Sequence, residues 1–304
     1  MKINLQKIIL VFAFFSSFAA LLYEIVWFRW LQVIFGASLP AQTTVFSVFL
    51  LGLALGSYFG GKFCSRLSGK KIIIFYALIE LGIAISVLFV PLAISFFVKL
   101  NALSFIDGLW LKSIFRFVFV GIILLIPTTL IGSTFSPLLL LYSGKNSEKV
   151  SSNFSAVYFF NTLGGVLGVV LAGFFLIRLF GLRAAMTIAV LSNVLIFFCA
   201  LFLTKKDFSF SENKISEKNI EEKREFFIPF LLFFSGFISL SYEIIWGRLL
   251  ALQFFGTIYS TTILLACFLL GISLGSWIYG KYCKNTGLKL FFFIELLIAI
   301  FAVL

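Results

Sequence analysis

Long apolar stretches, each separated from the next by a short polar segment, dominate the amino-acid sequence. Eight complete stretches reach the length of about 20 residues that a helix needs to cross a hydrocarbon core of about 30 Å. They cover residues 8–35, 41–61, 72–98, 114–142, 153–177, 183–203, 227–255 and 258–280, and a ninth begins near residue 290. We therefore expect an all-α polytopic membrane protein with about 8–9 transmembrane helices, and we expect the sequence to end inside the last of them.

Composition and charge agree with a membrane protein, since 62% of the residues are hydrophobic, 12% are charged and the mean hydropathy is +1.14. The net charge of +12 does not indicate a nucleic-acid partner, because residues 204–226 carry equal numbers of acidic and basic side chains and the surplus flanks the apolar stretches. With the N-terminus in the cytoplasm, the inner segments hold about three times as many Lys and Arg residues as the outer segments. This distribution predicts a multi-pass protein of the inner (plasma) membrane, surrounded by lipid, with a cytoplasmic N-terminus.

The residue types exclude several kinds of catalytic and metal site. The chain contains no histidine, which excludes Ser-His-Asp and Cys-His nucleophilic catalysis and the common zinc and haem sites. The cysteines lie far apart in the sequence, which argues against a disulfide framework and a metal site: Cys64, Cys199, Cys267 and Cys283. We expect no catalytic residue, metal or cofactor in these residues.

An internal repeat organises the chain. Residues 21–36 resemble residues 240–256, and the same relation joins 49–64 with 268–283 and 79–85 with 294–300. Six predicted helices separate equivalent positions, so both copies enter the membrane in the same direction, as in the parallel six-helix repeats of the major facilitator superfamily. The predicted parts are a first six-helix repeat, a charged cytoplasmic linker and the start of an incomplete second repeat: residues 1–203, 204–226 and 227–304.

The motif Tyr-Glu-x-x-Trp-x-Arg occurs once in each half and contains the acidic residues Glu24 and Glu243. One hypothesis is that these two carboxylates face a shared central cavity and bind a cation, because an ionisable group in hydrocarbon is costly unless it is paired or hydrated. Four aromatic side chains would add cation-π contacts: Tyr23, Trp27, Tyr242 and Trp246. The alternative is an aromatic belt at the outer interface, where Arg29 and Arg248 extend into the headgroup region.

Two further polar side chains lie near the predicted midplane of the membrane. Glu80 is nine residues beyond Lys71, and Asn161 has a comparable depth in its own segment. We favour a cavity-facing or proton-carrying role for Glu80 over that of a protonated carboxyl in a packed interface, because central cavities are where transporters with repeats bind their solutes. Glu295 is its counterpart in the second repeat.

Glycines recur at four-residue spacing on three of the apolar stretches. Such spacing exposes bare backbone on one helix face and allows a neighbouring helix to approach closely, so we predict helix packing rather than ligand binding. The predicted packing glycines are Gly52, Gly56, Gly164, Gly168, Gly271 and Gly275.

Five segments together resemble the membrane region of the fused major-facilitator and spermidine-synthase proteins, a family similar to membrane-integral polyamine aminopropyltransferases. They are ALLYEIVWFRWL with LGLALGSYFGGK, PTTLIGSTFSPLL from Pro127, VYFFNTLGGVLGVVLAGFFLIRLFGL at 157–182, and the second YEIIWGRLL. Members of this family often carry a soluble aminopropyltransferase domain that uses decarboxylated S-adenosylmethionine and putrescine. No such domain is visible here, so the resemblance assigns no catalytic residue to this chain.

Three functions follow from the residues and from this resemblance. The first is binding or transport of a small cationic, polyamine-like solute, with Glu24, Glu80, Asn161 and Glu243 as polar contacts. The second is an anchor and substrate conduit for a polyamine aminopropyltransferase whose catalytic domain lies beyond residue 304. The third is a structural scaffold without a solute.

Overall fold

The computed structural model describes residues 5–35, 38–99, 108–144, 147–205, 227–254, 258–282 and 288–303, and it contains no β-strand within these ranges. The elements are α1 (Leu5–Phe35), α2 (Ser38–Ser65), α3 (Lys70–Lys99), α4 (Leu109–Ser133), α5 (Phe135–Ser143), α6 (Ser147–Val170), the π-helix η1 (Leu171–Leu176), α7 (Ile177–Thr204), α8 (Phe227–Gln253), α9 (Ile258–Tyr282) and α10 (Leu288–Val303). Within the described ranges, seven helical stretches are long and apolar enough to cross a membrane. The fold is therefore that of an all-helical membrane protein.

The fifth and sixth predicted spans form one continuous helical stretch, Asn153–Thr204. Gly181 interrupts the regular geometry of this stretch with a φ of 80° and a ψ of 172°. Glycine tolerates this positive φ because it has no Cβ, so the direction of the chain can change here without a polar loop. Hydropathy alone placed the boundary near this glycine, at residues 177–183.

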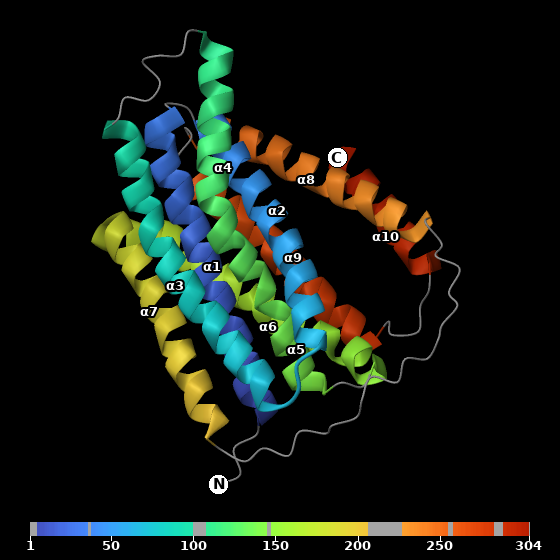
Figure 1. Ribbon diagram of the computed structural model, residues 1–304. Helices are drawn as coiled ribbons and strands as arrows, with labels where there is room; N and C mark the ends of the chain where they lie inside the picture. Colours follow the sequence, from blue (N-terminus) through green and yellow to red (C-terminus); the bar gives the residue numbers. More distant parts are fainter. Residues whose placement is uncertain are drawn as a thin grey trace.

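Helices α1–α7 form a bundle, with α9 against α6 and with α8 and α10 side by side beyond it (Figure 1). Within the bundle, α2 packs along α4, α1 along α6 and α3 along α7. The core contains the fully buried side chains of Tyr23 and Trp27 in one cluster and of Tyr76 in a second. Helix α1 contributes to both clusters and is the central element of the first seven helices.

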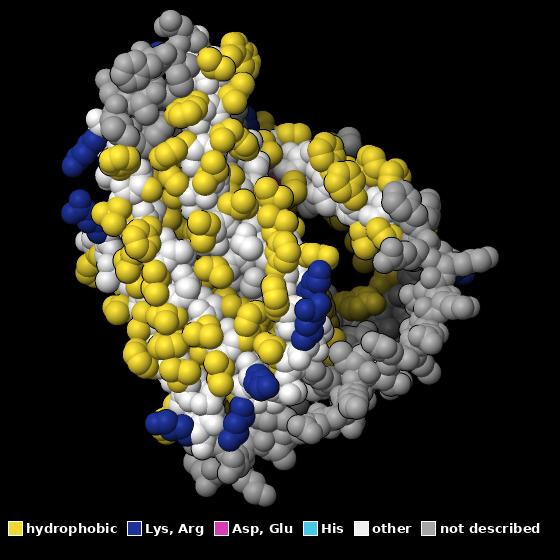
Figure 2. All heavy atoms as spheres, viewed as in Figure 1, with side chains coloured by type: hydrophobic (Ala, Val, Ile, Leu, Met, Phe, Trp, Pro, Cys, Tyr) yellow, Lys and Arg dark blue, Asp and Glu magenta, His cyan; other side chains and the backbone are white. Residues whose placement is uncertain are grey.

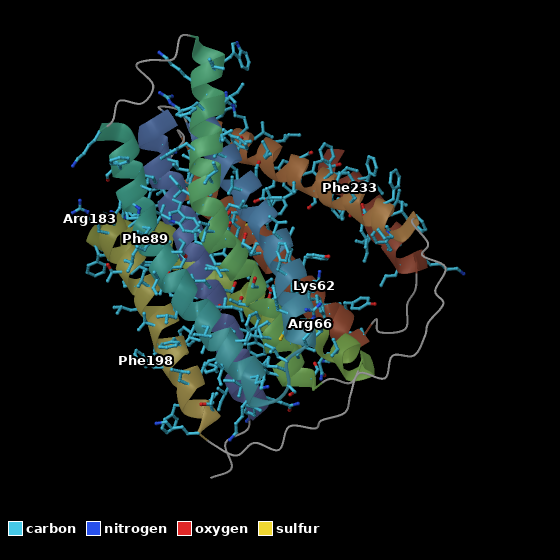
Figure 3. All side chains as sticks on the ribbon, viewed as in Figure 1. Lys62, Arg66, Phe89, Arg183, Phe198 and Phe233 are labelled. Carbon is cyan, nitrogen blue, oxygen red and sulfur yellow. The ribbon has the colours of Figure 1, made fainter. Side chains whose placement is uncertain are left out.

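The surface of the bundle is apolar. Figure 2 shows hydrophobic side chains over most of one face, with Lys and Arg mainly toward its margins. Phe89, Phe198 and Phe233 project away from the helices that carry them and are 61%, 61% and 67% exposed (Figure 3). A water-soluble protein rarely exposes so continuous an apolar surface, whereas a lipid-facing surface has this composition.

Glycines allow the closest approaches between helices of the bundle. A Cβ atom at Gly52 or Gly56 of α2 would overlap atoms of α4, and one at Gly164 or Gly168 of α6 would overlap the backbone of α1. Ser133 Oγ donates a hydrogen bond to the Gly56 carbonyl oxygen at 3.0 Å, across the same α2–α4 contact. Close backbone packing and a serine hydrogen bond are typical of helix pairs in membranes.

The equivalent glycines of the second repeat do not lie at a close contact between described helices. No described atom lies within 4 Å of a Cβ built at Gly271 or Gly275 of α9. Helix α9 instead contacts α6 through another face, where Ser273 Oγ and Ser276 Oγ donate hydrogen bonds to the carbonyl oxygens of Phe159 and Ser155. Within the described ranges, therefore, the two equivalent glycine faces have different surroundings.

We expect Gly56→Ala to destabilise the protein by roughly 1–3 kcal/mol, because the new methyl group would meet the Thr129 carbonyl oxygen and the α4 backbone. The equivalent change Gly275→Ala is the matched control, since it adds the same methyl group where no described atom lies within 4 Å. Thermal unfolding of both variants in the same detergent measures the effect. Equal loss of stability in the two variants would contradict the assignment of the α2–α4 contact to these glycines.

Candidate functional site

A cavity of about 370 Å³ lies among α1, α2, α4, α5 and α6. Its wall is mainly apolar, but six side chains bring hydroxyl or amide groups to it: Ser16, Ser17, Ser57, Thr134, Tyr158 and Asn161. Ser16 lies eleven residues beyond the start of α1, roughly 16 Å along the helix, which places the cavity in the interior of the membrane span. Asn161 was predicted as a polar contact near the midplane, and the structure places it in this wall. The cavity offers neutral hydrogen-bonding groups in an otherwise apolar setting.

Glu80 lies behind this cavity in a buried network of hydrogen bonds. Ser16 Oγ donates to Glu80 Oε1 at 2.6 Å, and Asn193 Nδ2 donates to Glu80 Oε2 at 2.5 Å. Tyr23 Oη donates to Asn193 Oδ1 at 2.6 Å. The side chain of Glu80 has no exposed surface, and that of Asn193 has 1%. The network joins α1, α3 and α7, and Ser16 belongs both to it and to the cavity wall.

The network is needed because burying a carboxyl group away from water costs free energy. A polar group removed from water is costly unless hydrogen bonds replace those it made with the solvent, and each oxygen of Glu80 accepts one such bond. The buried hydroxyl of Tyr76 lies near Glu80 but makes no hydrogen bond with good geometry. The network therefore holds Glu80 firmly between three helices and away from direct contact with the cavity.

Sequence reasoning missed Asn193, which links Tyr23 to Glu80 in the network. It lies within the apolar stretch 183–203, and an amide inside a membrane span is the same kind of signal that drew attention to Asn161. Its partners Tyr23 and Glu80 are 170 and 113 residues away in the sequence. Spacing along the chain therefore could not have connected them.

The two repeats share side-chain contacts as well as sequence. Ser235 Oγ of α8 donates a hydrogen bond to Glu295 Oε1 of α10 at 2.5 Å. This is the counterpart of the bond between Ser16 and Glu80 in the first repeat. Aromatic stacking is repeated too, with ring centroids 5.7 Å apart for Tyr23 and Trp27 and 5.9 Å apart for Tyr242 and Trp246. The repeated sequence thus makes the same local contacts in both halves.

Glu24 of α1 and Glu243 of α8 are close enough to interact electrostatically. Glu24 is buried, with 5% of its surface exposed, and Glu243 is half-buried. Like charges repel strongly where water is excluded, so two carboxylates in such a place favour a cation or a proton between them. The two copies of the motif thus place acidic side chains from different halves near one another.

The other residues of the two motifs have unequal surroundings. Tyr23 and Trp27 are completely buried in the core of the bundle, whereas 39% of the surface of Trp246 is exposed. Arg29 is half-buried and its Nη1 donates to Gln32 Oε1 at 2.8 Å, while Arg248 is exposed. The aromatic pair of the second half, with Tyr242 and Trp246, is therefore the more accessible of the two.

No group of three or more His, Cys, Asp or Glu side chains that could hold a metal ion occurs in the described part of the chain.

Known protein families, curated proteins and solved structures provide no match to this chain.

Proposed function

We propose that this chain is the membrane region of a carrier for a small cationic, polyamine-like solute, built from parallel repeats like those of the major facilitator superfamily. The observation that carries the proposal is the matched pair of acidic residues Glu24 and Glu243, each inside a helix long and apolar enough to cross a membrane. These residues occupy the same position of a repeated motif, lie on helices of different halves and are withdrawn from solvent. An ammonium group binds well between two carboxylates because it neutralises both and donates several hydrogen bonds.

The cavity supports a solute with more than one binding group. Ser17 at the cavity wall precedes Glu24 by seven residues, about 10 Å along α1. A volume of about 370 Å³ is in the range of small-molecule sites, and Asn161 and the hydroxyl groups offer hydrogen bonds to a second amine. An elongated diamine or triamine fits such an arrangement, with one ammonium group at the two glutamates and the chain along the apolar wall.

The repeats support a carrier more than a static binding protein. The first half packs against α9 of the second half through α6, and Glu24 of α1 and Glu243 of α8 belong to different halves. In transporters with parallel repeats the solute site lies between the two halves, which rock around it. Glu80 has a supporting part in this proposal, because Ser16 links it to the cavity.

Uptake into proteoliposomes tests the proposed function. Purified full-length chain is reconstituted, and entry of labelled putrescine and spermidine is measured with and without a proton gradient, with a neutral sugar alcohol of similar length as the control solute. We expect saturable uptake of at least one amine and none of the control. Absence of uptake for both amines would contradict a carrier and favour the anchor for an aminopropyltransferase or the scaffold.

A further inference from the structure

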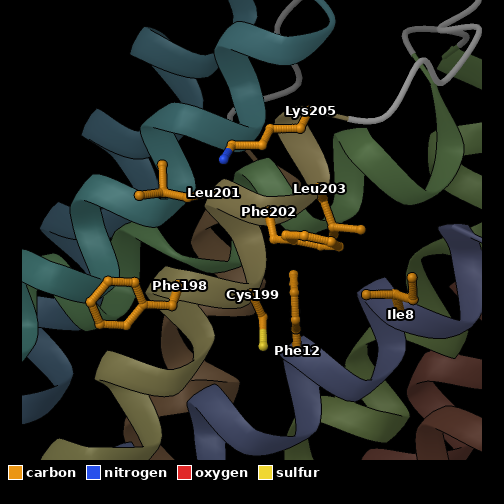
Figure 4. A pocket seen from close by; sticks show the side chains of 8 residues that line it. All are labelled: Ile8, Phe12, Phe198, Cys199, Leu201, Phe202, Leu203 and Lys205. Carbon is orange, nitrogen blue, oxygen red and sulfur yellow. The ribbon is translucent and has the colours of Figure 1, made fainter.

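A groove of about 740 Å³ separates the first turns of α1 from the last turns of α7 (Figure 4). Ile8 and Phe12 form the α1 side, and Phe198, Cys199 and Phe202 lie on the α7 side. Lys205, the residue after the end of α7, lies at one end of the groove. Because 60% of the Phe202 surface and 61% of the Phe198 surface are exposed, the groove opens outward, on the side that faces lipid.

The groove combines an apolar wall with one ammonium group. Of the lining residues that the structure describes, the others are hydrophobic side chains and the thiol of Cys199, so Lys205 is the one charged member among them. A lysine at the end of an apolar helix reaches toward the headgroup layer while its methylene chain remains along the apolar surface. The groove is thus complementary to an anionic phospholipid. Its apolar wall matches an acyl chain, and its positively charged end matches the headgroup.

A second groove on the other flank of α1 has the same layout. It has a volume of about 430 Å³, and its described lining consists of Leu10, Val11, Phe14, Phe15 and Phe160 with one charged residue, Lys7. Lys7 lies in the first turn of α1 and Lys205 follows the last turn of α7, and these two helix ends lie at the same end of the bundle (Figure 1). Each groove therefore presents one lysine at the same level of the membrane.

We propose that the groove between α1 and α7 binds an anionic phospholipid, with an acyl chain between Phe12 and Phe202 and the phosphate at the Lys205 ammonium group. Basic pockets between transmembrane helices bind anionic headgroups, and hydrocarbon is the fluid that surrounds this surface. A free phosphate ion is a poor occupant, because Lys205 is the one charged group among the described lining residues and the apolar wall would exclude the hydration that the ion needs. This inference is independent of the solute proposed above.

Native mass spectrometry of the full chain from nanodiscs tests the lipid preference. The nanodiscs contain equal amounts of phosphatidylglycerol and phosphatidylcholine. We expect the wild-type chain to retain phosphatidylglycerol preferentially, and we expect Lys205→Ala to reduce this preference roughly fivefold. The control is Lys62→Ala, which removes the same charge from α2, outside both grooves. An unchanged preference in Lys205→Ala, or an equal loss in Lys62→Ala, overturns the proposal.

Labelling of Cys199 tests whether the lipid occupies the groove. Cys199 and Cys267 are both exposed, but only Cys199 lines the groove, so Cys267 is an internal control. In a Cys283→Ser background, we expect phosphatidylglycerol nanodiscs to slow the reaction of Cys199 with an apolar maleimide relative to phosphatidylcholine nanodiscs, without changing Cys267. Equal rates in the two lipids overturn the assignment, as does equal protection by soluble glycerol phosphate.

Discussion

The double variant Glu24→Gln/Glu243→Gln is expected to lose at least about 100-fold in affinity for spermidine. A hydrogen bond to a charged group contributes about 1.5–3 kcal/mol, and the double change removes two charged acceptors from one site. Each single variant retains one carboxylate, so we expect it to lose roughly tenfold or more. Equilibrium binding of labelled spermidine in detergent measures these affinities without requiring transport.

Glu295→Gln is the matched control for this series. It removes the same charge from another helix of the second half, where the carboxyl accepts a hydrogen bond from Ser235. We expect its spermidine affinity to stay within about threefold of wild type, which separates a local effect from a general loss of negative charge. Unchanged affinity in the Glu24→Gln/Glu243→Gln variant would remove the basis of the proposed site.

Asn193→Leu is expected to have the largest effect on stability, roughly 2–6 kcal/mol. The substitution keeps the branched shape and the number of heavy atoms of the side chain but removes the donor to Glu80 and the acceptor for Tyr23. Both of those groups are buried, so each loses a hydrogen bond that water cannot replace, at about 1–3 kcal/mol each. Thermal unfolding in detergent, followed by the loss of monodisperse protein, measures the difference.

Ser192→Ala provides the comparison on the same helix. The Ser192 hydroxyl donates only to the Ile188 carbonyl oxygen of its own helix, at 3.0 Å, so we expect a change within about 0.5 kcal/mol. If Asn193→Leu unfolds at the same temperature as wild type, the buried network does not hold α1, α3 and α7 together in the way that its geometry implies.

The spans and the packing glycines of the first repeat could be predicted because both depend on local sequence. Hydropathy over about 20 residues reflects the thickness of the membrane, and glycine spacing reflects the face of a single helix. The two equivalent glycines of α9, Gly271 and Gly275, show the limit of this reasoning, because spacing indicates a face but not which helix covers it. The repeated motif likewise has the same stacked aromatic pair in both halves, but Trp27 is buried and Trp246 is exposed.

The candidate site could be predicted only in part, because its geometry depends on how each helix is rotated. Glu80 and Asn161 were both placed near the midplane, yet Asn161 lines the cavity and Glu80 lies behind it. Tyr23 was considered as a cation-π contact or as part of an interfacial belt, and it is instead a buried hydrogen-bond donor to Asn193. Depth follows from counting residues, whereas orientation follows from packing with distant segments.

The π-helical turn at Leu171–Leu176 has a consequence for how the long helical stretch Asn153–Thr204 continues beyond α6. Its Gly173 lies against the Thr262 side chain of α9, so the irregular turn is located where the two halves touch. A π turn has i→i+5 hydrogen bonds and holds more residues than an α-helical turn, so the residues after it are rotated about the helix axis relative to regular α-helix. Helix α7 therefore presents a different face from the one that an uninterrupted α-helical continuation of α6 would give it.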